Sequence, residues 1–287
     1  MRLATIQTAT GPRAAILKGS SFIDLHATDG SQPTSVRALL EAGPDALHAA
    51  ARIADKPDAV RHDAAHTKLL PPIPDPPKII CIGLNYRDHA AEQGIAVPAE
   101  PVVFSKFATA LIGHESPIVL PRVSKEVDYE AELVIAVGKK GRPASAEQAI
   151  SYVAGYTIGH DVSARDWQLK KEGKQWLCGK SFDTFAPSGP VLVTGDEVAD
   201  PQNLAIQLRL NGKTMQSSNT KELVFGVGRL LAYLAQVFTL EAGDLIFTGT
   251  PPGVGFARKP PVFLQPGDVV EVEIAGLGIL RNPVVEG

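Results

Sequence analysis

Three acidic residues are placed where strands could hold them together. Glu130 and Glu132 are separated by one residue in VDYEAELVIAVG (127–138). This segment predicts a strand, so both side chains project from the same face. The residues that follow, 133–137, are apolar on both faces, which predicts that the strand is buried. Asp161 ends a second apolar segment, GYTIGHD (155–161), and can supply a third oxygen to the same place.

Two like charges this close together on a buried strand are costly unless a cation neutralises them. Three carboxylates without a soft ligand suit Mg²⁺ or Mn²⁺, which would keep open positions for water or substrate. From the pattern alone, the alternative is a solvated Glu-x-Glu at the edge of a sheet. The acidic residues therefore predict a metal site without establishing one.

A second group of residues could move protons. His89 and Glu92 in NYRDHAAEQG (85–94) lie three positions apart, so they share one face of a helix. A carboxylate that orients a histidine gives a general base that works near neutral pH, although an ordinary surface helix is the alternative. Lys180 lies among apolar and small residues in CGKSFDTFAP (178–187), where its charge could stabilise a developing enolate.

Three further residues could hold a substrate. Arg165 and Gln168 in SARDWQ are spaced for one helical face and could bind a carboxylate, although surface positions are the alternative. FTGTPPGVG (247–255) resembles a phosphate loop, but its two prolines remove amide donors that such a loop uses. We interpret it as a strand end and a tight turn that places Thr250 at the site. Cys178 has no evident partner base and is expected to be buried packing.

The elements that must position these residues are mostly short strands. Pro71–Pro77 contains five prolines and predicts a linker between a small N-terminal domain, residues 1–70, and a main domain, residues 78–287. Apolar spacing predicts helices at 36–54 (interrupted near Gly43–Pro44), 86–93, 144–152 and 222–238. The segment WQLKKEGKQW (167–176) is expected to be a polar connection. Strands are expected over most of the remaining chain.

Composition excludes several classes of protein. The 287 residues carry a net charge of −3 with no basic patch, which argues against nucleic acid as a partner. No apolar run reaches the roughly 20 residues that a membrane span needs. The two cysteines are far apart in sequence and predict neither a disulfide framework nor a zinc site. This cysteine usage fits a reducing cytoplasm, and the N-terminus lacks the order of a signal peptide, so a cytoplasmic protein is expected.

Several motifs together resemble the fumarylacetoacetate hydrolase family. In chain order they are IGLNYRDHAAE, FSKF, VDYEAELVIAVGKKG, GYTIGHDVSARDWQ, GKSFDTFAPSGP, LRLNGKTMQSSNT and LIFTGTPPGVG. They cover about residues 75–287 and are most similar to the branch of fumarylacetoacetate hydrolase domain-containing proteins. The resemblance implies an α+β, mostly β fold, with a mixed β-roll or sandwich and a small N-terminal α/β domain. It also implies a homodimer that uses Mg²⁺ or Mn²⁺.

The resemblance also implies a role for each candidate residue. The metal ligands would be Glu130, Glu132 and Asp161. The catalytic residues would be His89 and Glu92, on a lid helix that orders over substrate, and Lys180. The substrate-binding residues would be Arg165, Gln168, Thr250 and Tyr86, and Asn85 also matches the family motif.

The implied substrates are small 2-oxo or 1,3-dioxo acids that react through an enolate. Hydrolytic cleavage of a carbon–carbon bond in an acylpyruvate is the first expectation. Tautomerisation or decarboxylation of oxaloacetate is the alternative, because both share the enolate. A catalytically silent metal-binding protein is a third possibility, against which the joint presence of His89, Glu92 and Lys180 argues.

Overall fold

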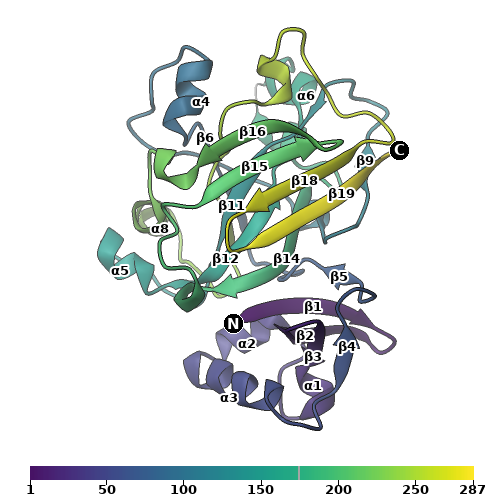
Figure 1. Ribbon diagram of the computed structural model, residues 1–287. Helices are drawn as coiled ribbons and strands as arrows, with labels where there is room; N and C mark the ends of the chain where they lie inside the picture. The colour runs from purple at the N-terminus through teal and green to yellow at the C-terminus, as the bar shows by residue number, and fades with distance from the viewer. Residues whose placement is uncertain (174) are drawn as a thin grey trace.

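One long sheet runs through the whole molecule (Figure 1). The computed structural model describes residues 1–173 and 175–287, and twelve described strands belong to this sheet. Ten of them follow in the order β4 (Arg61–Asp63), β3 (Ser21–Asp24), β2 (Gly11–Lys18), β1 (Arg2–Thr8), β14 (Ala186–Thr194), β12 (Val153–His160), β11 (Ala131–Val137), β17 (Leu245–Phe247), β6 (Ile79–Gly83) and β7 (Val102–Ser105). β5 (Leu69–Leu70) pairs with β1, and β8 (Leu111–Ile112) pairs with β14.

The first 70 residues form one end of this sheet and the helices beside it. These helices are α1 (Leu25–Thr28), α2 (Val36–Glu41) and α3 (Pro44–Ala54). The predicted interruption of the helix is confirmed, because α3 begins at Pro44, a residue well suited to a first helical position. β1 joins the N-terminal strands to the rest of the sheet, with Leu3 opposite Leu192. The division into domains at residues 71–77 stays a prediction.

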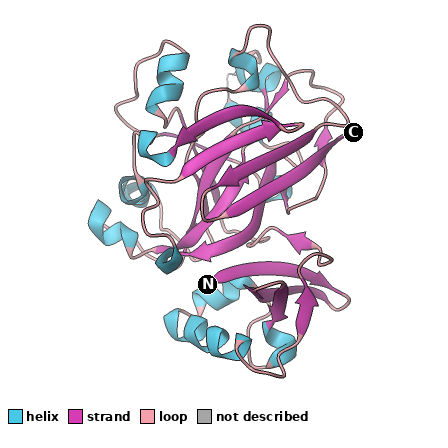
Figure 2. Ribbon diagram, in the orientation of Figure 1, coloured by secondary structure: helices cyan, strands magenta, loops and turns pink. Residues whose placement is uncertain are grey.

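A second sheet packs against the middle of the long one, as Figure 1 shows. Its five strands are β16 (Lys213–Asn219), β15 (Ala205–Leu210), β18 (Val269–Ile274), β19 (Gly278–Glu286) and β9 (Ile118–Leu120). The main core lies between the two sheets and includes Leu133 and Ile158 from one and Leu208 and Val272 from the other. Figure 2 shows strands forming the body of the molecule and helices around it. The predicted α+β, mostly β class is confirmed.

The alternation of side chains along β11 separates the core from the candidate site. Leu133 and Ile135 point toward the second sheet and are fully buried there. Because neighbouring side chains point to opposite faces, Glu132 lies on the other face. Val134 shares that face and packs near Phe247. The acidic side chain is therefore buried behind the main core rather than inside it.

Three helices of the main part lie close to their predicted positions: α4 (Arg87–Glu92), α5 (Ala146–Ile150) and α8 (Val227–Val237). Two more, α6 (Arg165–Leu169) and α7 (Trp176–Lys180), lie where apolar spacing predicted no helix. α8 begins later than predicted because Gly226 is extended and residues 220–222 form a separate 3₁₀ turn. The 3₁₀ turns are η1 (Ala108–Ala110), η2 (Gly195–Glu197), η3 (Thr220–Glu222) and η4 (Gly255–Ala257). No helix among the described residues is both long and apolar enough to cross a membrane.

Two segments differ from their predicted structure. Residues 127–138 form two strands rather than one: β10 (Val127–Asp128) pairs with β13 (Ser163–Ala164), and β11 begins only at Ala131. The side chain of Asp128 accepts the next backbone N–H, which takes that amide out of a strand ladder. Residues 167–176 are not only a connection, because α6 ends and α7 begins inside this segment. Residue 174 of this segment lies outside the described residues.

Candidate active site

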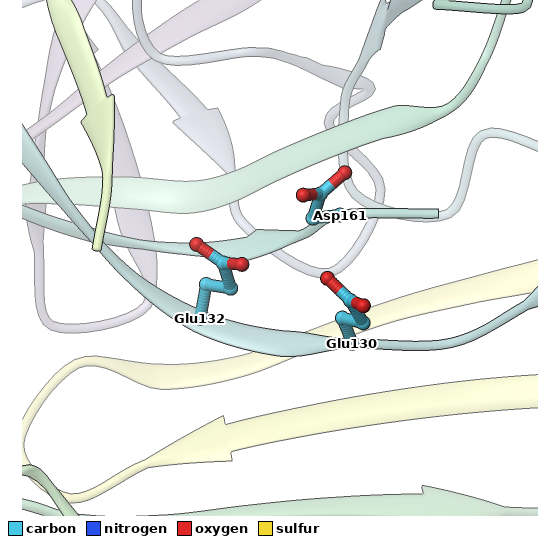
Figure 3. A group of neighbouring side chains, drawn as sticks. All are labelled: Glu130, Glu132 and Asp161. Atoms are coloured by element: carbon cyan, nitrogen blue, oxygen red, sulfur yellow. The ribbon is translucent and has the colours of Figure 1, made fainter. Parts of the chain in front are cut away.

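The three predicted carboxylates come together (Figure 3). Glu130 directly precedes β11, Glu132 is its second residue, and Asp161 directly follows β12. The pairing of β11 with β12 brings these positions side by side, and the Asp161 N–H donates to the Glu130 carbonyl at 3.0 Å. One oxygen of each carboxylate lies within 4.8 Å of the others. All three residues are buried.

Two cations neutralise Glu130. Lys180 Nζ donates to Glu130 Oε2 at 2.7 Å, and Arg165 Nη2 donates to Oε1 at 2.6 Å. Burial by itself would raise the pKa of Glu130, but Lys180 and Arg165 outweigh burial and hold this pKa at about 2. Glu130 is therefore a carboxylate at neutral pH.

Glu132 is in the opposite electrostatic position. The described residues offer it one hydrogen bond, from the Gly249 N–H at 2.8 Å. Gly249 has a φ of 99°, which favours glycine, and an added Cβ would lie 2.9 Å from Cβ of Asn85. Burial raises the pKa of Glu132 well above its ordinary value, and the charges of Asp161 and Glu130 raise it further.

The residues present fit a divalent cation. Three buried carboxylates converge, and the described side chains pair no cation with Glu132, so burial raises its pKa. Oxygen donors of this kind suit Mg²⁺ or Mn²⁺ better than metals that prefer sulfur. Such an ion would supply the missing positive charge. The site therefore matches the metal site that the sequence predicts.

Lys180 carries positive charge into the acidic cluster. Its Nζ also donates to Asp161 Oδ2 at 2.8 Å and lies 5.2 Å from the centroid of the Phe104 ring. Burial would lower the pKa of Lys180, but Asp161 and Glu130 outweigh burial and raise it. The side chain is therefore a cation, as an enolate-stabilising role requires.

Lys106 is a second buried lysine, which the sequence analysis did not single out. Its Nζ donates to the carbonyl oxygens of Val162, Lys180 and Phe185, and it lies 2.7 Å from Asp161 Oδ1. Because three carbonyls take its protons, the contact with Asp161 is a charge contact rather than a directed hydrogen bond. Lys106 thereby joins the segments after β12 and α7. The only sequence signal is a lysine directly after the apolar strand VVFS.

His89 and Glu92 form the predicted pair on α4. His89 Nδ1 lies 3.1 Å from Glu92 Oε2, and Gln93 Nε2 lies 2.7 Å from His89 Nε2. The Gln93 amide donates, so Nε2 carries the lone pair and Nδ1 the proton. Gln93 was missed, although its place four residues after His89 puts it on the same helical face. Gly253 N–H donates to the other Glu92 oxygen at 2.9 Å, which ties α4 to the TGTPPGVG segment.

A second buried histidine lies next to the acidic cluster but is unsuited to the same role. Burial, reinforced by the charge of Lys106, lowers the pKa of His160 to about 3. Its ring nitrogens have no hydrogen-bond partner among the described residues. His89 is the histidine that reaches the cavity described below.

Arg165 is held on three sides. Its Nε donates to Asp128 Oδ2 at 2.8 Å, its Nη1 donates to Gln168 Oε1 at 2.8 Å, and its guanidinium lies 4.5 Å from the centroid of the Phe256 ring. Asp128 also accepts the N–H groups of Gly255, at 2.6 Å, and Phe256, at 3.1 Å. Asp128 was missed by the sequence analysis because it lies before the Glu-x-Glu pattern. It fixes both the arginine and the ring against which the arginine packs.

Thr250 lies at the site, whereas Tyr86 lies behind it. Gln216 Nε2 donates to Thr250 Oγ1 at 2.9 Å, and Gln216 is a further residue that the sequence analysis missed. Tyr86 is fully buried, and its hydroxyl has no partner among the described residues. Burial, reinforced by the charge of Glu132, raises the pKa of this hydroxyl, so it stays protonated. Cys178 is exposed, so the expectation that it is buried packing is wrong.

A cavity of about 130 Å³ brings the candidate residues together. Its wall combines charged, polar and apolar residues. The polar residues are His89, Gln93, Glu130, Glu132, Arg165, Gln168, Lys180 and Thr250, and the apolar part includes Ile82, Gly83, Leu84, Phe104, Leu169, Trp176 and Phe256. Asp161 and Glu92 reach this group through their contacts with Lys180 and His89. Tyr86 is not part of the wall.

A two-sheet fold with a buried acidic cluster, a lysine and a histidine beside a small cavity defines a class of metal-dependent enzyme. The family described as fumarylacetoacetate (FAA) hydrolase C-terminal matches residues 78–285. The chain belongs to the fumarylacetoacetate hydrolase family and is an enzyme of that family. The resemblance inferred from its motifs is confirmed.

Three known proteins show how the chain relates to this family. It is 50 % identical to oxaloacetate tautomerase fahd2 of Xenopus laevis, over 99 % of the chain and 90 % of that protein. It is 36 % identical to a fumarylacetoacetate hydrolase from Exiguobacterium antarcticum, with a TM-score of 0.87 and full coverage of both chains. It is 33 % identical to maleylpyruvate hydrolase from Sphingobium sp. SYK-6 in complex with manganese(II) and pyruvate, with a TM-score of 0.83 and full coverage of both chains.

The prediction of a cytoplasmic protein is wrong. The relative from Xenopus laevis is named a mitochondrial protein, as is a human relative. The prediction rested in part on cysteine usage, and two cysteines without a disulfide pattern are compatible with any reducing compartment. Nothing in that pattern separates one such compartment from another.

Proposed function

We propose that this enzyme catalyses the keto–enol tautomerisation of oxaloacetate and that Glu130, Glu132 and Asp161 hold Mg²⁺ or Mn²⁺ for this reaction. The observation that carries the proposal is the cavity, in which a histidine, a lysine and an acidic cluster converge on about 130 Å³. Pockets for drug-sized ligands measure roughly 300–1,000 Å³. The smaller space favours a short acid such as oxaloacetate.

The comparisons support the same choice. The relative that is 50 % identical is named an oxaloacetate tautomerase, and the match extends over almost the whole of both chains. This finding favours the reaction that the sequence analysis held as its alternative. Membership of an enzyme family also removes support from the catalytically silent interpretation.

The chain's own residues provide for proton transfer. His89 Nε2 takes a proton from C3 of the keto acid, while Glu92 accepts the Nδ1–H and keeps the ring in the required tautomer. The C3–H electron pair becomes the C2–C3 double bond, the C2=O π pair moves onto the 2-oxygen, and the protonated His89 returns the proton to that oxygen to give the enol. Gln93 must give way, because its amide contacts the same nitrogen of His89.

Charge stabilisation and binding come from other residues of the cavity wall. The Lys180 ammonium stabilises negative charge that develops on the 2-oxygen. The remaining N–H groups of Arg165, together with Gln168 and Thr250, bind the carboxylate groups of the substrate. A bound divalent cation would supply further polarisation of the 2-oxo group.

Hydrolysis of an acylpyruvate is the second candidate. The related structure of maleylpyruvate hydrolase carries manganese and pyruvate, and the His89–Glu92 pair could equally activate a water molecule.

The homodimer that the family resemblance implies stays a prediction, which analytical ultracentrifugation would test.

The proposal predicts metal-dependent exchange between the two forms of oxaloacetate. We would follow loss of the enol by ultraviolet absorbance, with added Mn²⁺ or Mg²⁺, and identify the products by NMR. Glu132→Ala should abolish metal binding and activity, and His89→Asn should lower kcat by about 100-fold or more, the usual contribution of a general base. His66→Asn, at an exposed histidine, is the matched control and should leave kcat unchanged.

The same experiment separates the alternatives. Pyruvate and CO₂ as products would indicate a decarboxylase, and turnover of acylpyruvates without oxaloacetate exchange would indicate a hydrolase. Full activity after complete chelation of metal would refute the proposed role of the three carboxylates.

A further inference from the structure

An indole ring forms part of the apolar wall of the cavity. Trp176 lines the cavity together with Gly83 and Phe104, and Arg165 and Lys180 are among its charged residues. A dicarboxylate uses the charged residues, because apolar side chains offer its carboxylate groups no hydrogen bonds. We propose that Trp176 determines substrate length by filling the space that the tail of a longer 2-oxo acid would need. This inference rests on the proposed function and refines its substrate class.

The indole ring is held in place by its contacts. A Cβ added at Gly83 would lie 2.4 Å from the Trp176 ring, so this glycine provides the room in which the ring lies. The Phe104 ring packs edge-on against the indole, with centroids 5.3 Å apart and an interplanar angle of 71°. The ring is therefore a fixed part of the wall.

The same helix positions the indole and the catalytic lysine. Trp176 and Lys180 are the first and last residues of α7. Gly179 presses this helix against α6, because an added Cβ would lie 2.6 Å from the backbone nitrogen of Gln168. The helix cannot move aside for a longer tail without disturbing Lys180. Phe104 contacts both the indole and the Lys180 ammonium. A shift of the indole would therefore disturb the packing around the lysine that stabilises the enolate.

A chain-length series tests this assignment. The substrates are oxaloacetate and acylpyruvates with progressively longer tails, and the readout is exchange of C3 protons for deuterium, followed by NMR with Mn²⁺ present. In Trp176→Ala, the ratio of kcat/KM for the longest tail to that for the shortest acid should rise about 10-fold or more, the usual effect of a methylene in an apolar pocket. Trp167→Ala is the matched control, because Trp167 packs on Phe182 outside the cavity wall, and its ratio should not change.

A second variant tests the contact itself. Gly83→Ala should lower activity at least 10-fold when Trp176 is present, because the new Cβ forces the indole to move. The same substitution should have little effect in Trp176→Ala, where the obstructing ring is gone, so the two changes should not be additive. Additive losses would overturn the proposal.

The chain-length ratio provides the other decisive outcome. An unchanged or smaller ratio in Trp176→Ala would also overturn the proposal. Failure of the proposed function is seen separately, as absence of oxaloacetate exchange in the wild-type enzyme. In that case the acylpyruvate series alone decides whether Trp176 limits the tail.

Discussion

Two glutamates separated by one residue have opposite electrostatic environments. Glu130 lies between Lys180 and Arg165, and its pKa is held at about 2. Glu132 is equally buried but faces two other carboxylates, and its pKa is raised. The sequence predicts their common position, because the Glu-x-Glu spacing depends only on local strand geometry. It could not predict the difference, because the cations come from α6 and α7 far along the chain.

This difference predicts that Glu132→Gln stabilises the protein when divalent cations are removed. Without metal, the folded protein must hold Glu132 protonated at neutral pH, and a glutamine, which is neutral at every pH, removes this free-energy cost, on the order of 1 kcal/mol. Because its folded-state pKa is raised, wild-type Glu132 makes stability fall as pH rises above the ordinary value of 4.5, where only the unfolded chain loses the proton. Urea unfolding in EDTA across a pH series should show this fall in the wild type and less of it in the variant. Added Mn²⁺ should stabilise only the wild type.

Glu130→Gln is the matched control and should have the opposite effect. Removing this charge leaves Lys180 and Arg165 without their shared partner, which should cost about 3 kcal/mol. The folded-state pKa is lowered, so the stabilisation is complete above 4.5 and is lost as pH falls toward about 2. If both glutamine variants changed stability in the same direction, the assigned environments would be wrong.

At the scale of elements, local sequence patterns predict what is local. The Gly43–Pro44 pair locates the break between α2 and α3, and apolar spacing locates α8. The pattern fails where a side chain competes for backbone groups, as Asp128 does between β10 and β11. It also fails for α6 and α7, because these short helices flank a polar stretch and their own sequences, RDWQL and WLCGK, show no apolar period.

Connections between elements at the site depend on single buried side chains, of which Gln216 on β16 is the clearest. It accepts the Ala131 N–H at 2.9 Å and donates to both Thr250 and the Pro251 carbonyl. Gln216→Ala should cost about 2–3 kcal/mol, because it leaves buried polar groups unpaired, and kcat should fall because Thr250 loses its position. Chemical denaturation and kinetic measurements check the two effects.

Gln207→Ala is the control on the neighbouring strand. Gln207 is half-buried and donates to Glu273, so its loss should cost less than about 1 kcal/mol and leave kcat unchanged. Equal losses in both variants would show that Gln216 has no special role in joining β16 to the Thr250 turn.

At the scale of the molecule, the sequence predicts two parts, but it does not predict how they are joined. The proline-rich segment 71–77 separates them along the chain. In space, β1 pairs with β14, so one sheet extends from the N-terminal strands to the strands that carry the acidic cluster. Pairing between strands so far apart in sequence leaves no local signal. We therefore expect a substitution that destabilises the N-terminal strands to destabilise the main part as well.

Leu3→Ala tests this expectation. Leu3 is fully buried on β1 opposite Leu192, and the cavity left by the substitution should cost about 2–5 kcal/mol. Both tryptophans, Trp167 and Trp176, lie in the main part, so fluorescence reports its unfolding alone while far-ultraviolet circular dichroism reports both parts. If the sheet makes the N-terminal and main parts one cooperative unit, Leu3→Ala shifts the urea unfolding midpoint seen by fluorescence as far as the midpoint seen by dichroism. Val60→Ala, at a residue 39 % exposed in the same N-terminal part, should change neither by more than about 0.5 kcal/mol. A fluorescence midpoint that stays in place in Leu3→Ala would mean that the N-terminal residues unfold as an independent domain, despite the continuous sheet.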